Sequence, residues 1–144
     1  MLLDGHIHIN PCEVDRPAFI ARLNSAGVDG GVVMSMSPNS FRNNAQLFTT
    51  KERLDNLVAW TGAHQHLYPF YWIDPMEPDA IEQVALAIRH KVVGFKVICT
   101  HFYPGDNKAM AVYAAIAKAG KPILFHSGIL WDGFNSAKYN RPGE

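Results

Sequence analysis

The sequence has few of the features that mark secreted, membrane-embedded or nucleic-acid-binding proteins. Its two cysteines, Cys12 and Cys99, are isolated and form no Cys-x-x-Cys pattern, so no disulfide framework is expected. No basic-then-apolar leader opens the chain, which indicates a reduced, cytoplasmic setting. No apolar run approaches the about 18 residues of a membrane span. The net charge is zero, which argues against nucleic acid or an anionic membrane as a partner.

The residues that are present are typical of one α/β domain. The chain has 144 residues, 48% of them hydrophobic, which is enough for a buried core. Short apolar runs alternate with segments of helical periodicity. Strands are expected at residues 1–8, 28–36, 67–73, 92–99 and 122–125, helices at 17–26, 44–60, 79–90 and 108–119, and a loop at 129–144. This order predicts a parallel sheet with right-handed crossovers.

Two architectures fit this order of elements. One is a doubly wound open sheet, which normally completes itself in about this length. The other is the first five strands of an eight-stranded (β/α) barrel, a fold that typically needs about 250 residues. In both folds the chemistry lies beyond the carboxyl ends of the strands.

Histidines follow several of these strand ends. His6 and His8 end the first strand, where alternate side chains share a face, and Asp4 on that face could orient one of the imidazoles. His126 ends the fifth strand, and His101 closely follows the fourth. Neutral imidazole is a good ligand for zinc and related metals, so this rim predicts a metal site. A second His-x-His pair, at residues 64 and 66, precedes the third strand and is expected on the opposite rim.

Lys96 lies inside the apolar run Val92 to Cys99, and buried lysines are rare unless they are paired or functional. Its amine could be carbamylated and bridge two metal ions, or it could stay an amine and bind an anionic substrate. It could equally reach the rim or pair with a carboxylate such as Asp4 or Asp74. The sequence leaves these alternatives open.

Five motifs, taken in order along the chain, resemble the amidohydrolase superfamily of metal-dependent (β/α)-barrel enzymes, and its amidohydrolase-2 branch in particular. They are Asp4-Gly5-His6-Ile7-His8, Trp72-Ile73-Asp74-Pro75, Pro78-Asp79-Ala80-Ile81-Glu82, Val93-Gly94-Phe95-Lys96-Val97 and Pro122-Ile123-Leu124-Phe125-His126-Ser127-Gly128. The resemblance implies that residues 1–144 are the N-terminal part of a single barrel domain. The family also uses a histidine after strand six and an aspartate after strand eight, and neither has a counterpart in this sequence.

The resemblance also implies roles for individual residues. His6, His8 and His126 would bind a divalent metal, with zinc expected, and Lys96 would be a further ligand if it is carbamylated. His126 and His101 are the catalytic candidates. The implied reaction is hydrolysis, in which metal-activated water attacks an ester, lactone or amide carbon of a small molecule. A homo-oligomer is compatible with this assignment.

Two other functions remain open. The first is a metal-dependent decarboxylase, which removes carbon dioxide from an unsaturated or aromatic acid and needs a cation near the metal. The loops at residues 37–44 and 102–107, which could close over a substrate, offer only Arg42 and the adjacent Lys108 for this. The second is a non-enzymatic, flavodoxin-like open-sheet module in which the histidines are incidental.

Overall fold

A computed structural model describes residues 1–11, 14–41, 46–62, 64–128 and 136–140. One parallel sheet runs through the molecule, in the order β1-β2-β3-β4-β5. Its strands are β1 (Leu3–His8), β2 (Gly30–Met34), β3 (Leu67–Trp72), β4 (Gly94–Val97) and β5 (Ile123–Phe125). The order in the sheet is therefore the order in the chain, whereas a doubly wound sheet reverses direction at a switch point. Repeated right-handed crossovers in one direction curl the sheet into part of a (β/α) barrel, and the expectation of an open doubly wound sheet is wrong.

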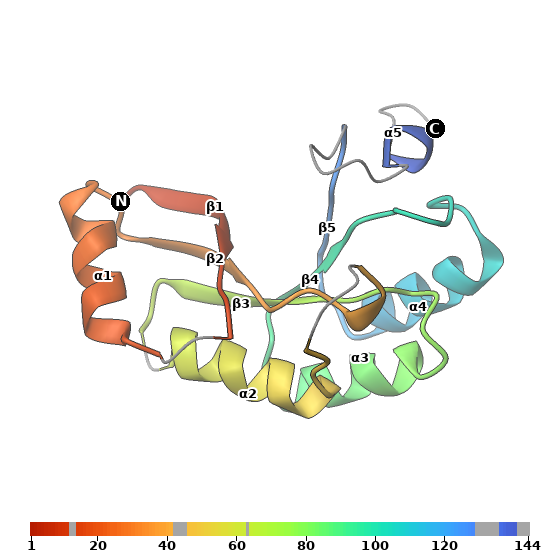
Figure 1. Ribbon diagram of the computed structural model, residues 1–144, viewed down its shortest axis with the longest axis horizontal. Helices are drawn as coiled ribbons and strands as arrows, with labels where there is room; N and C mark the ends of the chain where they lie inside the picture. The colour runs from red at the N-terminus through yellow and green to blue at the C-terminus, as the bar shows by residue number, and fades with distance from the viewer. Residues whose placement is uncertain (12–13, 42–45, 63, 129–135, 141–144) are drawn as a thin grey trace.

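The helices occupy the crossovers between these strands. They are α1 (Arg16–Ser25), α2 (Thr50–Thr61), α3 (Ala80–Arg89) and α4 (Asn107–Lys118). Figure 1 shows α2, α3 and α4 side by side along one face of the sheet. Asp15 caps α1, because its carboxylate accepts the N–H of Ala18 at 3.0 Å. No helix in the described ranges is long and apolar enough to cross a membrane.

Two predicted boundaries are wrong. The helix expected from residue 44 begins at Thr50. There Thr49 accepts the N–H of Glu52 at 3.2 Å, and the Glu52 carboxylate accepts the N–H of Thr49 at 2.7 Å. This reciprocal capping box satisfies the free N–H groups of the first turn and sets the start of the helix. The stretch 129–144, expected to be loop, contains the short helix α5 (Ser136–Tyr139).

The two faces of the sheet differ in composition. Val33, Tyr71 and Phe95 are fully buried in the core between the sheet and the helices. The Tyr71 hydroxyl donates to the side chain of Gln83 in α3 at 2.9 Å, which fixes this face as the helix side. Because side chains alternate along a strand, the neighbours of these residues in sequence point to the opposite face.

Strand register identifies the residues on that opposite face. Trp72 pairs with Lys96, and Lys96 pairs with Leu124. The Val97 carbonyl accepts the N–H of His126 at 2.9 Å, so the ladder continues to His126, which follows Leu124 by two residues and shares its face. His8 pairs with Met34, and Met34 pairs with Phe70. Phe70 precedes Trp72 by two residues in β3 and shares its face, so His8 lies on this face too. The face opposite α2, α3 and α4 therefore carries His8, Trp72, Lys96 and His126.

Candidate metal and substrate site

The first strand brings two imidazoles together at its end. The Nε2 atoms of His6 and His8 lie 2.8 Å apart, and their ring centroids lie 4.8 Å apart. An irregularity in β1 between Asp4 and Ile7 contributes to this geometry. The Asp4 carboxylate accepts the main-chain N–H of His6 at 2.8 Å, so it holds the backbone there rather than an imidazole.

The electrostatic surroundings keep both imidazoles neutral. Desolvation by the surrounding protein lowers the pKa of His6, and the positive charge of Lys96 lowers it further. Desolvation also lowers the pKa of His8, with contributions from His6 and Lys96. Neutral imidazole is the form that binds a metal ion, so the pair is prepared for that role.

His126 belongs to the same electrostatic environment. Desolvation lowers its pKa first, followed by the charges of Lys96 and His6. Its Nε2 atom is buried and has no hydrogen-bond partner among the described residues. A buried polar nitrogen without a partner costs free energy and needs an explanation such as a bound ion or ligand.

Lys96 is 1% exposed, although it carries an ionisable amine. Desolvation lowers the pKa of that amine from 10.5 to about 8. Within the described ranges, neither Asp4 nor Asp74 pairs with it. Asp4 accepts the N–H of His6, and Asp74 accepts the N–H of Met76 at 2.8 Å and the hydroxyl of Ser40 at 2.5 Å. The amine therefore lies on the site face, and the described part of the chain does not supply the carboxylate that usually accompanies a buried lysine.

An apolar wall adjoins the histidines. Phe41, Trp72 and Ile98 form a buried cluster separate from the main core. The rings of Phe41 and Trp72 lie 4.5 Å apart, and the Trp72 ring contacts that of His8 edge-on at 5.7 Å. Phe41 comes from the short 3₁₀ helix η1 (Asn39–Phe41), which follows β2. The site face thus places ionisable groups beside two aromatic rings, which are tilted at 60° to each other.

His101 lies on the rim after β4, where the sequence placed it, and its side chain is 47% exposed. Its Nε2 lies 3.3 Å from Asp74 Oδ2, and its Nδ1 lies 3.0 Å from the Thr100 hydroxyl. The nearby Lys108 ammonium donates to the main-chain carbonyl of Met76 at 2.6 Å. Arg42 lies outside the described residues. His64 and His66 precede β3 at the opposite end of the sheet.

The described residues match a metal centre in chemistry but do not complete one. Across these ranges, no three His, Cys, Asp or Glu side chains form a group that could hold a metal ion. The donors that would be required are nevertheless present, because the Nε2 atoms of His6 and His8 converge and the Nε2 of His126 is buried without a partner. A metal held by His6, His8 and His126 stays a prediction, as does a carbamate on Lys96.

Arg53 supports this rim, although no sequence pattern singled it out. Arg53 lies in α2 but is 2% exposed, with its guanidinium 4.6 Å from the centre of the Tyr71 ring. It donates to the carbonyl of Met36 at 3.2 Å and also to the carbonyl of Trp72. Arg53 therefore links the segment after β2 to the end of β3 by hydrogen bonds, next to the apolar wall.

Comparison with known proteins gives one informative structural likeness. No family model matches the sequence, and no curated protein does. The fold is similar to that of a 5-carboxyvanillate decarboxylase from Novosphingobium aromaticivorans, solved with bound manganese and 3-methoxy-4-hydroxy-5-nitrobenzoic acid. The TM-score is 0.60 at 14% identity, over 83% of this chain and 36% of that one. At this identity the likeness shows the fold, and the chain spans little more than a third of the enzyme's length.

Proposed function

We propose that this chain forms part of a metal-dependent (β/α)-barrel enzyme that removes carbon dioxide from a small aromatic or unsaturated carboxylic acid. The observation that carries the proposal is Lys96. Its buried ammonium has no carboxylate partner among the residues that the structure describes and lies on the same face as three histidines, so it is suited to bind the carboxylate of a substrate. The sequence left this role of Lys96 open, and the loops offered only Arg42 and Lys108 for it.

Individual residues would have different roles in this reaction. Lys96 remains mainly protonated at pH 7, since its pKa is about 8, and would pair with the substrate carboxylate. The Phe41–Trp72 pair would contact the flat face of the substrate and exclude water from it. His101, on the rim, is the candidate to deliver a proton to the carbon from which carbon dioxide departs.

His6, His8 and His126 would hold the divalent metal. A bound divalent cation would supply positive charge that polarises a substrate oxygen. The structural relative contains manganese, so zinc, the expected metal, has no specific support. Imidazole ligands suit several divalent transition metals.

Hydrolysis, the first expectation from the sequence, would use the same imidazoles. It would employ Lys96 as a carbamate or leave it without a role. The fold relative is a decarboxylase, and this favours the decarboxylase alternative as the proposal.

The test is a comparison of product release on a small substrate panel. The purified protein, loaded with manganese or zinc, is given hydroxylated aromatic acids and, separately, lactones. Carbon dioxide is measured in the first set and proton release in the second. We expect carbon dioxide release that Lys96→Met reduces at least tenfold and His64→Ala leaves unchanged. Lactone hydrolysis without carbon dioxide release would refute the proposal.

A further inference from the structure

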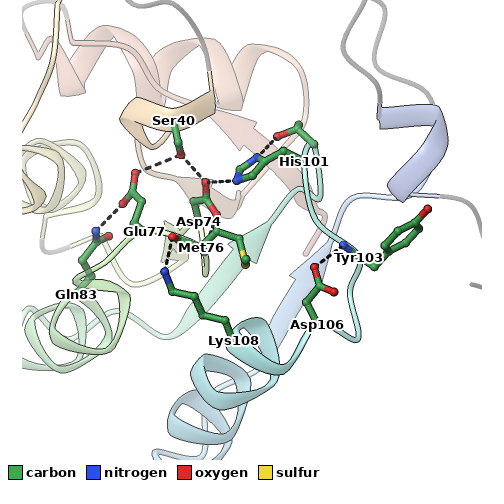
Figure 2. Close-up of polar contacts among 10 residues, drawn as sticks. Ser40, Asp74, Met76, Glu77, Gln83, His101, Tyr103, Asp106 and Lys108 are labelled. Carbon is green, nitrogen blue, oxygen red and sulfur yellow. Dashed lines mark hydrogen bonds and ion pairs between the residues drawn. The ribbon is translucent and has the colours of Figure 1, made fainter.

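Three loops at the carboxyl ends of neighbouring strands meet at one carboxylate, that of Asp74 (Figure 2). Asp74 follows β3 and is 5% exposed. Its Oδ2 accepts the hydroxyl of Ser40, after β2, at 2.5 Å, and lies 3.3 Å from Nε2 of His101, after β4. Its Oδ1 accepts the main-chain N–H of Met76 at 2.8 Å. A single side chain therefore joins the segments that follow β2, β3 and β4.

This arrangement does not fit a nucleophilic triad. In such a triad the imidazole lies between the hydroxyl and the carboxylate and accepts the hydroxyl proton. Here the carboxylate lies in the middle, and both Ser40 and His101 face it. Ser40 also lies 3.2 Å from Oε1 of Glu77, a second carboxylate. Its hydroxyl is therefore committed as a hydrogen-bond donor and is not activated as a nucleophile.

Ser40 connects the carboxylate to the apolar wall. It is followed directly by Phe41, whose ring lies against Trp72 at 4.5 Å. Trp72 in turn contacts His8 at 5.7 Å. A continuous set of contacts thus runs from Asp74 through Ser40, Phe41 and Trp72 to the histidine pair. His101 contacts the same oxygen of Asp74, and it also contacts Thr100 and Phe102, which are not part of this wall.

We propose that Asp74 is a positioning residue that, through Ser40, holds Phe41 against Trp72 and so sets the shape of the apolar wall of the substrate site. The proposal rests on the proposed function to the extent that this wall contacts a substrate. It assigns different roles to the two neighbours of Asp74. Ser40 transmits its position to the wall, whereas His101 does not.

The chain offers matched variants for this distinction. Asp74→Asn keeps the size of the side chain but has one acceptor oxygen where the carboxylate has two, so Ser40 and Met76 compete for it. Ser40→Ala removes the hydroxyl that contacts Asp74 and Glu77 and leaves both carboxylates in place. His101→Gln removes only the arm toward the β4 loop. Glu77→Gln is the control for the longer contact of Ser40.

Two measurements on the whole protein report the packing of Phe41 against Trp72 and do not depend on enzymatic activity. The indole N–H resonance of Trp72, identified by its loss in Trp72→Phe, reports the ring contact with Phe41. Hydrogen exchange of the Phe41 amide, which donates to the Pro38 carbonyl at 3.0 Å, reports the order of η1. We expect Ser40→Ala and Asp74→Asn to move the resonance and to speed this exchange at least about tenfold. His101→Gln and Glu77→Gln should change neither.

Kinetics then connect the wall to the substrate. With the acid that the enzyme decarboxylates, Ser40→Ala should raise KM more than it lowers kcat, because a loosened wall weakens binding of the flat substrate face. The proposal is overturned if Ser40→Ala leaves the resonance and the exchange unchanged, or if His101→Gln alters them as strongly. If the spectra respond as expected but no acid is decarboxylated, the proposed function fails and the positioning role stands.

Discussion

Replacing Lys96 with methionine should stabilise the fold while it removes function. The pKa of Lys96 falls from 10.5 to about 8 on folding because burial disfavours the charged amine. That difference corresponds to about 3 kcal/mol, and solvent reaching the open face reduces it, so we expect a gain of about 1.5 to 3 kcal/mol at pH 7.

The sign of the pH dependence follows from the direction of this pKa. A lowered pKa means that the unfolded chain binds the proton more tightly, so Lys96 destabilises the native state at every pH below about 8. The penalty shrinks as the pH rises from about 8 toward 10.5 and is absent above that. The advantage of Lys96→Met should therefore be largest at neutral pH and mostly lost by about pH 10.5.

Urea denaturation of both proteins at pH 7, 9 and 10.5 measures this advantage. Lys118→Met, at an exposed position of α4, is the matched control and should change stability by less than about 0.5 kcal/mol. Carbon dioxide release should fall in Lys96→Met even as the free energy of unfolding rises, a trade typical of functional sites. A variant that is less stable at pH 7 would show that the amine has a partner, and the reasoning would be refuted.

Three further predictions concern the metal, the thiol and the sheet. His126→Ala should bind less divalent metal than the parent protein, as measured by elemental analysis after dialysis. His64→Ala, at the opposite end of the sheet, should bind as much metal as the parent. Equal metal content in both variants would count against His126 as a ligand. Cys99 is buried, and its pKa is raised to about 11. Alkylation of its thiol at pH 8 should therefore be about a hundredfold slower than that of an ordinary thiol and should become fast in denaturant. Peptide mass spectrometry measures the rate of alkylation. A Cβ at Gly94 would lie 2.4 Å from the Phe70 ring, whereas one at Gly5 would have no neighbour within 4 Å, so Gly94→Ala should cost about 1–3 kcal/mol in thermal or urea unfolding and Gly5→Ala much less.

The elements themselves could be predicted because their signals are local. All five strands and three of the four crossover helices lie within a few residues of the expected ranges, and the exception is the start of α2. Gly27 and Gly120 follow α1 and α4 with φ of 72° and 67°, a conformation that side chains disfavour. The start of α2 was misjudged because apolar residues before Thr49 share the helical period, while the capping box determines where the helix begins.

The candidate site was predictable only in part. Position at or just after a strand end identified His6, His8, His101 and His126, because parallel strands end at the same rim. Lys96 was identified as a lysine inside an apolar run. Which of these groups touch one another depends on contacts between distant segments. Ser40 and Asp74 are 34 residues apart, and no periodicity links them. Arg53 had no distinguishing signal in the sequence, and its structural role becomes visible only through its hydrogen bonds to the carbonyls of Met36 and Trp72.

The agreement between sheet order and chain order has a consequence for synthesis on the ribosome. Each strand emerges directly after the one it will pair with, so pairing needs no partner that has yet to be translated. Contacts between residues far apart in sequence can form only once the later residue has left the exit tunnel. The two hydrogen bonds between Asn140 and the backbone of Cys99 are an example. The strands would then pair one after another in chain order, and the contacts between the loops at the rim would form last.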